Sequence, residues 1–182
     1  MICHSKLKGD RAMNQLKKSL TKIGFNTNDY IVVCIGTQKA YLDSVGPLVG
    51  TVLKRKLPNL IVYGILGDNC HALNIETKFN EIHKLYPNKK ILAIDACCTS
   101  FEEKLGTIEM SKGAIRPGAG VGKNLPAIGD YAIKAFTVEK NCQQLLDDDL
   151  LKRSSRRDEL MSYVIDVVHT ISSAIIDVSN KN

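Results

Sequence analysis

The sequence predicts an α/β fold, a three-layer α/β/α sandwich built around a mostly parallel sheet. Three observations predict it. Short apolar runs rich in β-branched residues alternate along the chain with segments that have the apolar periodicity of helices. These runs are continuously apolar, as expected of strands that are covered on both faces. The order strand, helix, strand, helix, strand is typical of parallel strands joined by crossover helices.

Four helices are predicted from apolar residues at spacings of three and four. They are an amino-terminal helix over about 10–24, a helix from Val45 that ends before Pro58, a third over 75–86, and a closing helix over about 157–178. Asn74 is expected to cap the third helix, and Ser155 with Asp158 the closing one. The expected core face of the closing helix is Met161, Val164, Ile165, Val168, Ile171 and Ile175.

Five strands are predicted from the apolar runs that lie between these helices. They cover residues 30–35, 60–66, 91–94, 106–110 and 131–138. The fourth strand is short, so we expect it at an edge of the sheet. The acidic run 147–149 reads as an exposed connection. Gly46 and Gly50 are four residues apart in the second helix, which predicts a close approach of that helix to the sheet.

The composition narrows the class of protein. With 182 residues, 44% of them hydrophobic and 24% charged, the chain is expected to form a single α/β domain over residues 1–182. Aromatic residues make up 5% and Trp is absent, which argues against a base-stacking nucleic-acid platform despite the net charge of +6. The chain has no C-x-x-C pair, no signal-peptide pattern and no long apolar run. We therefore expect a reduced, cytoplasmic protein with no nucleic-acid or membrane partner.

Two carboxylates are the main candidates for chemistry. Asp43 follows the first strand across a short polar loop, and Asp95 is predicted to end the third strand. If these strands are neighbours where the strand order reverses, both carboxylates face one crevice at the carboxyl edge of the sheet. Such a pair can share a proton and activate a water molecule. The alternative is that each only caps a helix or a turn.

His71 follows the second strand and is expected at the same edge. Three roles are open for it: to orient a carboxylate, to complete a divalent-metal site with Asp43 and Asp95, or only to satisfy the loop backbone. A nucleophile scheme that pairs His71 with Cys70 or Cys98 is less favoured, because neighbours in sequence rarely point at each other.

A Gly/Pro-rich segment separates the fourth and fifth strands. It does not match the P-loop pattern, because Pro117 stands where that pattern requires Gly and Asn124 where it requires Ser or Thr. We expect the segment to border a cleft where its backbone approaches a bound peptide, the alternative being a plain surface turn. The predicted substrate-binding residues are Gly118, Gly120, Lys123 and Asn124.

Several short motifs, taken in order, resemble the YyaC-type spore-protease family of sporulation proteins. They are Gly36-Thr37, the run 43–50, Val62-Tyr63-Gly64, the run 71–74, Ile94-Asp95-Ala96, the run 116–121, Leu125-Pro126 and Gly129-Asp130. The resemblance covers about residues 30–138, and the first and last helices lie outside it. That family is more distantly similar to the germination protease of spore-forming bacteria and to hydrogenase maturation endopeptidases.

The resemblance implies a three-layer α/β/α fold and an unusual aspartic-type peptidase. Asp43 and Asp95 match the two Asp positions of germination protease, which degrades small acid-soluble spore proteins. In the hydrogenase enzymes, acidic residues at these two positions help to bind nickel of the substrate. His71 does not match their metal histidine.

The sequence and the resemblance together predict a sporulation- or germination-associated endopeptidase that acts on protein or peptide substrates, such as small acid-soluble spore proteins. Asp43 and Asp95 would activate water, His71 would orient them, and no cofactor would be needed. One alternative is a non-catalytic peptide-binding protein with the same fold. Another is a metal-dependent hydrolase that uses Asp43, Asp95 and His71 with a divalent ion. A homo-oligomer is compatible with either alternative.

Overall fold

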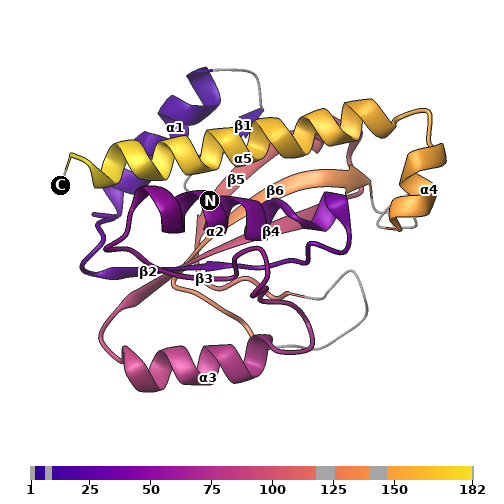
Figure 1. Ribbon diagram of the computed structural model, residues 1–182. Helices are drawn as coiled ribbons and strands as arrows, with labels where there is room; N and C mark the ends of the chain where they lie inside the picture. Colours follow the sequence, from indigo (N-terminus) through magenta and orange to yellow (C-terminus); the bar gives the residue numbers. More distant parts are fainter. Residues whose placement is uncertain (1–2, 7–9, 118–125, 140–146, 182) are drawn as a thin grey trace.

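The strands form one mixed sheet in the order β1-β5-β6-β4-β2-β3 within the described part of the chain. The computed structural model describes residues 3–6, 10–117, 126–139 and 147–181 (Figure 1). Its elements are β1 (Cys3–Lys6), α1 (Asp10–Lys22), β2 (Tyr30–Cys34), η1 (Tyr41–Asp43), α2 (Val45–Lys56), β3 (Ile61–Tyr63), α3 (Ile75–Leu85), β4 (Lys90–Thr99), η2 (Glu102–Lys104), β5 (Thr107–Lys112), β6 (Tyr131–Glu139), α4 (Asp148–Arg153) and α5 (Arg157–Ser179).

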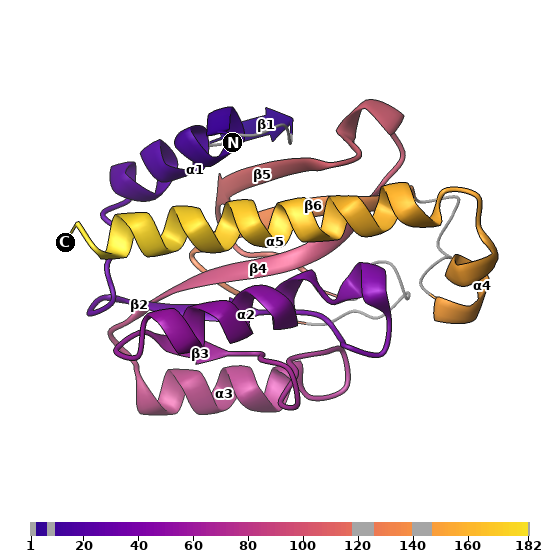
Figure 2. The ribbon, with the colours of Figure 1, turned by 45° about the horizontal axis from the view of Figure 1, so that its top comes forward.

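The predicted α/β/α sandwich is confirmed. Helices α1, α5 and α2 lie side by side over one face of the sheet, and α3 covers the other (Figures 1 and 2). Strands β3, β2, β4 and β6 are parallel, whereas β5 runs antiparallel to β6 and to β1. The larger apolar core lies under α1, α2 and α5, and a smaller one lies under α3.

The strand order reverses between β2 and β4. From β2 the chain passes through α2 to β3 on one side, and then through α3 to β4 on the other side of β2. This is the predicted neighbourhood of the first and third sequence strands. In open α/β sheets, ligands bind outside the carboxyl ends of the strands at such a switch point. The topology therefore directs attention to the loops that follow β2 and β4.

The predictions for β5 and β3 were wrong. The β5 strand is not an edge, because β1 pairs with it antiparallel from Cys3 opposite Met110 to Lys6 opposite Thr107. The β3 strand ends at Tyr63 rather than continuing to residue 66. The reason is Gly64, which has a φ of +83° and lies so close to β2 that a Cβ atom there would be 1.8 Å from the carbonyl oxygen of Cys34.

The predicted caps make no side-chain capping bonds, although Asn74 does occupy the N-cap position of α3. The Asn74 side chain turns back from α3, accepting from the backbone N–H of His71 at 2.9 Å and donating to the carbonyl of Asn69 at 2.9 Å. Ser155 and Asp158 do not cap α5, whose N-cap position is Arg156 and carries no side-chain cap.

The acidic run after β6 is not merely an exposed connection. The Asp147 side chain accepts hydrogen bonds from the backbone N–H groups of Asp149 and Leu150 and so begins the short helix α4. This is the usual N-cap role of Asp.

The buried stripe of α5 differs from the predicted one. Ile165 is 60% exposed, although it was assigned to the core face. The buried residues are Leu160, Val164, Val167, Thr170, Ile171, Ser172, Ala174, Ile175 and Val178. The stripe is wide because α5 packs on the sheet between α1 and α2. By length and composition alone α5 could cross a membrane, but it packs here as a core helix, as in a soluble domain.

Candidate active site

The loop that carries Asp43 is held tightly against the end of β2. The backbone N–H of Gly36 donates to the carbonyl of Cys70 at 2.8 Å. Gly36 has a φ of +139°, and a Cβ atom there would lie 2.1 Å from the carbonyl oxygen of Asp43. Only glycine allows this approach. The N–H of Thr37 then donates to the Asp43 carboxylate at 3.0 Å, which fixes the orientation of that carboxylate.

Two contacts from distant segments hold η1 from its other side. The hydroxyl of Thr137 on β6 donates to the carbonyl of Leu42 at 3.1 Å. The backbone N–H of Tyr41 donates to the carboxylate of Asp148 on α4 at 2.9 Å. Asp43 therefore sits on a short helix whose position depends on β2, β6 and α4 together.

The predicted close approach of α2 to the sheet is confirmed. A Cβ atom on Gly46 would lie 2.0 Å from the carbonyl oxygen of Ile35, and one on Gly50 would lie 2.3 Å from that of Gly64. Both glycines thus bring the amino-terminal half of α2 against the ends of β2 and β3. Because η1 comes directly before α2, this packing also helps to position Asp43 at the carboxyl edge of the sheet.

Asp95 does not end its strand, as the sequence predicted, but lies inside β4. The prediction failed because β4 continues to pair with β6 as far as Thr99, whereas its pairing with β2 stops at Ile94 opposite Cys34. Asp95 therefore lies just past the end of β2, beside the switch point. Its side chain is only 9% exposed.

Burial acts on both carboxylates, and the charge of Asp43 also acts on Asp95. Burial raises the pKa of Asp43 to about 6, against the opposing effect of the Thr37 N–H hydrogen bond. Burial, and next the charge of Asp43, raise the pKa of Asp95 well above its ordinary value. The backbone N–H of Ala96 and the charge of Lys134 oppose that rise only in part. The charge of Asp43 thus reaches Asp95, and both carboxyl groups are in surroundings that disfavour ionisation.

His71 does not join this pair. Its backbone carbonyl accepts from Asn74 and Ile75 N–H groups, and its Nδ1 accepts from the N–H of Leu73 at 3.3 Å. These bonds make His71 part of the turn that begins α3, which is the backbone-satisfying role among its three predicted roles.

The predicted three-ligand metal site is not assembled. Within residues 10–117, 126–139 and 147–181, no three His, Cys, Asp or Glu side chains come close enough together to hold a metal ion. Asp43, Asp95 and His71 are therefore not a ligand set here. The cause is local, since His71 is engaged in the turn before α3.

The structure does not support Cys70 as a nucleophile. Cys70 is fully buried, and burial raises the pKa of its thiol to about 11, which disfavours the thiolate. The predicted substrate-binding residues Gly118, Gly120, Lys123 and Asn124 lie outside the described residues.

Sequence reasoning missed two neighbours of Asp95. Lys134 on β6 is paired with Asp95 in register, and Cys97 lies two residues further along β4. Burial, and next the charge of Asp95, raise the pKa of the Cys97 thiol well above its ordinary value. One signal for Lys134 was present in the sequence: it is the single charged residue in the strand-like run 131–138.

Comparison with known proteins places the chain in a family. A family model described as "Protein of unknown function (DUF1256)" matches residues 3–171. The protein named "Uncharacterized protein YyaC" from Bacillus subtilis (strain 168) is 46% identical over 107 residues, which cover 58% of this chain and 52% of that protein. The match thus spans about half the length of this curated relative. Because the family model covers most of the chain, including Asp43 and Asp95, the chain belongs to the DUF1256 family, and the YyaC-type resemblance is confirmed.

Proposed function

We propose that this protein is an aspartic-type endopeptidase in which Asp43 and Asp95 activate a water molecule against a peptide bond. The observation that supports it is the pair itself: two carboxylates at the switch point, with the charge of Asp43 raising the pKa of Asp95. Carboxyl groups in one site whose pKa values are raised by burial and by a neighbouring carboxylate are typical of acid–base catalysis.

The two residues take different roles because their surroundings differ. Asp43 is half-buried and accepts the Thr37 N–H bond, so it carries the negative charge and acts as the base. Asp95 is more deeply buried and holds the proton, so it acts as the acid.

The reaction then balances in two steps. As the water oxygen bonds to the carbonyl carbon, Asp43 takes a proton from the water and Asp95 gives its proton to the carbonyl oxygen. In the second step the carbon–nitrogen bond breaks. The leaving nitrogen takes the proton from Asp43, and Asp95 regains its proton from a hydroxyl of the tetrahedral intermediate. The enzyme returns to its starting state.

The proposed biological setting comes from the family resemblance. The substrate would be a protein or peptide, with small acid-soluble spore proteins as the first to test, and the enzyme would work in the cytoplasm of the sporulating cell or in the spore. No cofactor is required by this mechanism. The non-catalytic alternative predicts peptide binding without turnover, so one assay can separate the two.

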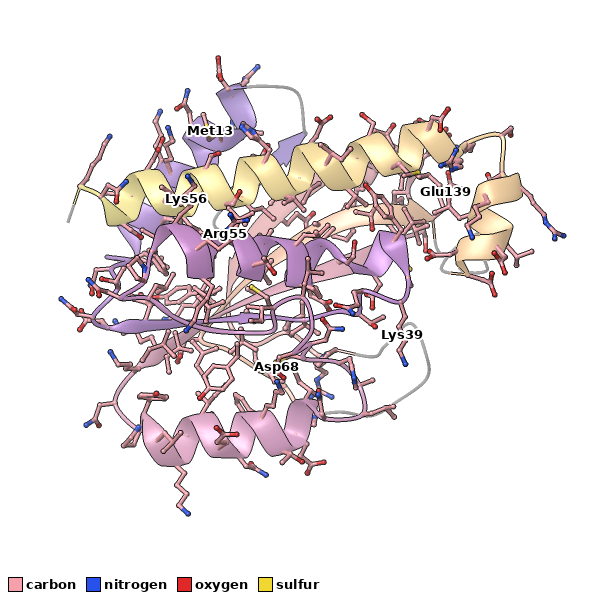
Figure 3. The ribbon with its side chains drawn as sticks, viewed as in Figure 1. Met13, Lys39, Arg55, Lys56, Asp68 and Glu139 are labelled. Atoms are coloured by element: carbon pink, nitrogen blue, oxygen red, sulfur yellow. The ribbon has the colours of Figure 1, made fainter. Side chains whose placement is uncertain are left out.

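The test is cleavage of small acid-soluble spore proteins by wild-type protein and by Asp43→Asn and Asp95→Asn variants. Loss of one acid–base group is expected to lower the cleavage rate by roughly 100-fold or more. Asp68→Asn is the matched control, because Asp68 lies on the loop after β3 (Figure 3) and its exposed carboxylate forms an ion pair with Lys78. A folded Asp43→Asn or Asp95→Asn variant that cleaves at the wild-type rate would contradict the proposal.

A further inference from the structure

A row of charged side chains crosses the sheet next to the carboxylate pair. Lys134 is paired in register with Asp95 on one side and with Glu109 on the other. Residues paired in register place their side chains on the same face of a sheet. Glu109 in turn forms an ion pair with Lys104 at 2.9 Å. The signs alternate along the row, from Lys104 to Glu109 to Lys134 to Asp95.

The row lies on the same face of the sheet as α3. Ala93 and Ala132 belong to the small core under α3, and the two-residue period of a strand places Asp95 and Lys134 on that face as well. Lys134 is half-buried in the middle of β6, whose neighbours Ile133 and Ala135 are fully buried. A cation in such a place is costly unless it faces an opposite charge.

We propose that Lys134 is a positioning residue of the Asp43–Asp95 pair, and that it stabilises the negative charge when that charge moves onto Asp95. The inference rests on the proposed function. In the first step of the reaction Asp43 gains a proton and Asp95 loses one, so the charge passes from the first carboxylate to the second. Lys134 is the register partner of Asp95, so its ammonium group favours the state after transfer over the state before it.

The surrounding groups support this role. The charged side chains that act on Asp95 among the described residues are Asp43, which opposes its ionisation, and Lys134, which favours it. The charge of Lys134 also opposes the rise in the pKa of the Cys97 thiol, which lies two residues beyond Asp95 on β4. Glu109, paired with Lys134 in register and bound to Lys104, fixes the far side of the row.

The test compares Lys134→Met with Lys134→Arg, which keeps the charge. Removing the charge is expected to lower kcat about tenfold with little change in KM, because the interaction matters after the proton has moved. The alkaline limb of the kcat–pH profile should move to higher pH, since the pKa of Asp95 rises when the cation is lost. Lys134→Arg should restore both. The matched control is Lys112→Met, an exposed cation at the end of β5.

A second readout does not depend on cleavage. Carbon-detected NMR titration of the Asp95 carboxyl should show a higher pKa in Lys134→Met than in the wild type, and a wild-type value in Lys134→Arg. If the methionine variant does not fold, Lys134→Gln takes its place. An Asp95 pKa unchanged by loss of the charge would overturn the inference. Failure of Asp43→Asn and Asp95→Asn to affect cleavage would instead overturn the proposed function, so the two failures are distinguishable.

Discussion

The two edges of the sheet use carboxylates in opposite ways. At the amino edge, exposed Asp130 accepts a hydrogen bond from the N–H of Ile91 at 2.8 Å, and its own N–H donates to the carbonyl of Ile91 at 2.8 Å. At the carboxyl edge, burial disfavours the ionisation of both Asp43 and Asp95, and the charge of Asp43 adds to this effect at Asp95. One edge uses acids to tie strands together, and the other holds acids where ionisation is disfavoured.

The distribution of basic residues follows the same division. Lys54, Arg55 and Lys56 occupy the last turn of α2, where cations complement the helix dipole (Figure 3). At the other edge, Lys134 is the cation next to the carboxylate pair. Local stabilisation explains the charged residues of the amino edge. At the carboxyl edge, Asp43 and Asp95 weaken the fold at neutral pH, because burial disfavours their ionised forms. Such a feature is expected where a protein does chemistry.

The largest expected effect concerns backbone packing at the carboxyl edge. Gly46→Ala should lower the free energy of unfolding by about 3 kcal/mol or more, because the new Cβ would meet the backbone of Ile35 and α2 must move. Urea denaturation measures this. Gly24→Ala at the other edge is the control, since Gly24 has a φ of +68° but open space around it, and it should cost only about 1 kcal/mol. Equal losses would contradict the packing described here.

The second prediction concerns the free energy of unfolding at pH 8. Replacing an Asp by Asn should raise it at the carboxyl edge and lower it at the amino edge. A carboxyl whose pKa is raised in the folded state stabilises the fold fully below its unfolded pKa and loses that contribution as pH rises through the folded value. For Asp43 this window runs from about 4 to about 6. Asp43→Asn, which can still accept from Thr37, should therefore be more stable than the wild type at pH 8, by at most about 3 kcal/mol, with no gain near pH 4.

Asp130→Asn is the matched variant at the amino edge. It weakens a charge-assisted hydrogen bond to Ile91, so the free energy of unfolding should fall by about 1 kcal/mol at pH 8. Thermal unfolding at pH 4 and pH 8 measures both variants. A destabilised Asp43→Asn at pH 8 would show that its carboxylate is structural.

The smallest expected effect concerns the hydrogen bond between η1 and α4, from the N–H of Tyr41 to the carboxylate of Asp148. Asp148→Ala removes the acceptor for the N–H of Tyr41 and should lower the free energy of unfolding by about 1 kcal/mol. Because η1 carries Asp43, the cleavage rate should fall by more than this loss of stability explains. The control is Asp149→Ala, whose exposed carboxylate pairs with exposed Lys152 and should leave both quantities unchanged. Equal cleavage by the two variants would argue against a positioning role for α4.

Sequence pattern was enough to place the main features of this edge. The apolar runs and their order predict the parallel strands, and strand order places Asp43 and Asp95 at the carboxyl edge beside the switch point. The pairing of Asp95 with Lys134 could not be predicted, because it depends on the register between β4 and β6, and no local pattern determines that register. The length of β4 was missed for the same reason, since pairing with β6 extends it past Asp95.

Other features depend on contacts between distant segments. The β1 strand consists of Cys-His-Ser-Lys, which has no apolar alternation, and it exists because β5 offers a free edge. The face of α5 was misassigned because apolar residues surround much of that helix, so its periodicity alone does not choose among stripes. His71 looked like a site residue in sequence, but its turn before α3 holds it apart.

The most direct test of the central claim is the pKa of the Asp95 carboxyl, followed by carbon-detected NMR in the wild type and in Asp43→Asn. If the two carboxylates form a coupled pair, replacing Asp43 removes a neighbouring negative charge, and the pKa of Asp95 should fall clearly while staying above its ordinary value because of burial. An Asp95 titration that is the same in both proteins would show that the carboxylates do not interact and would contradict the proposed site.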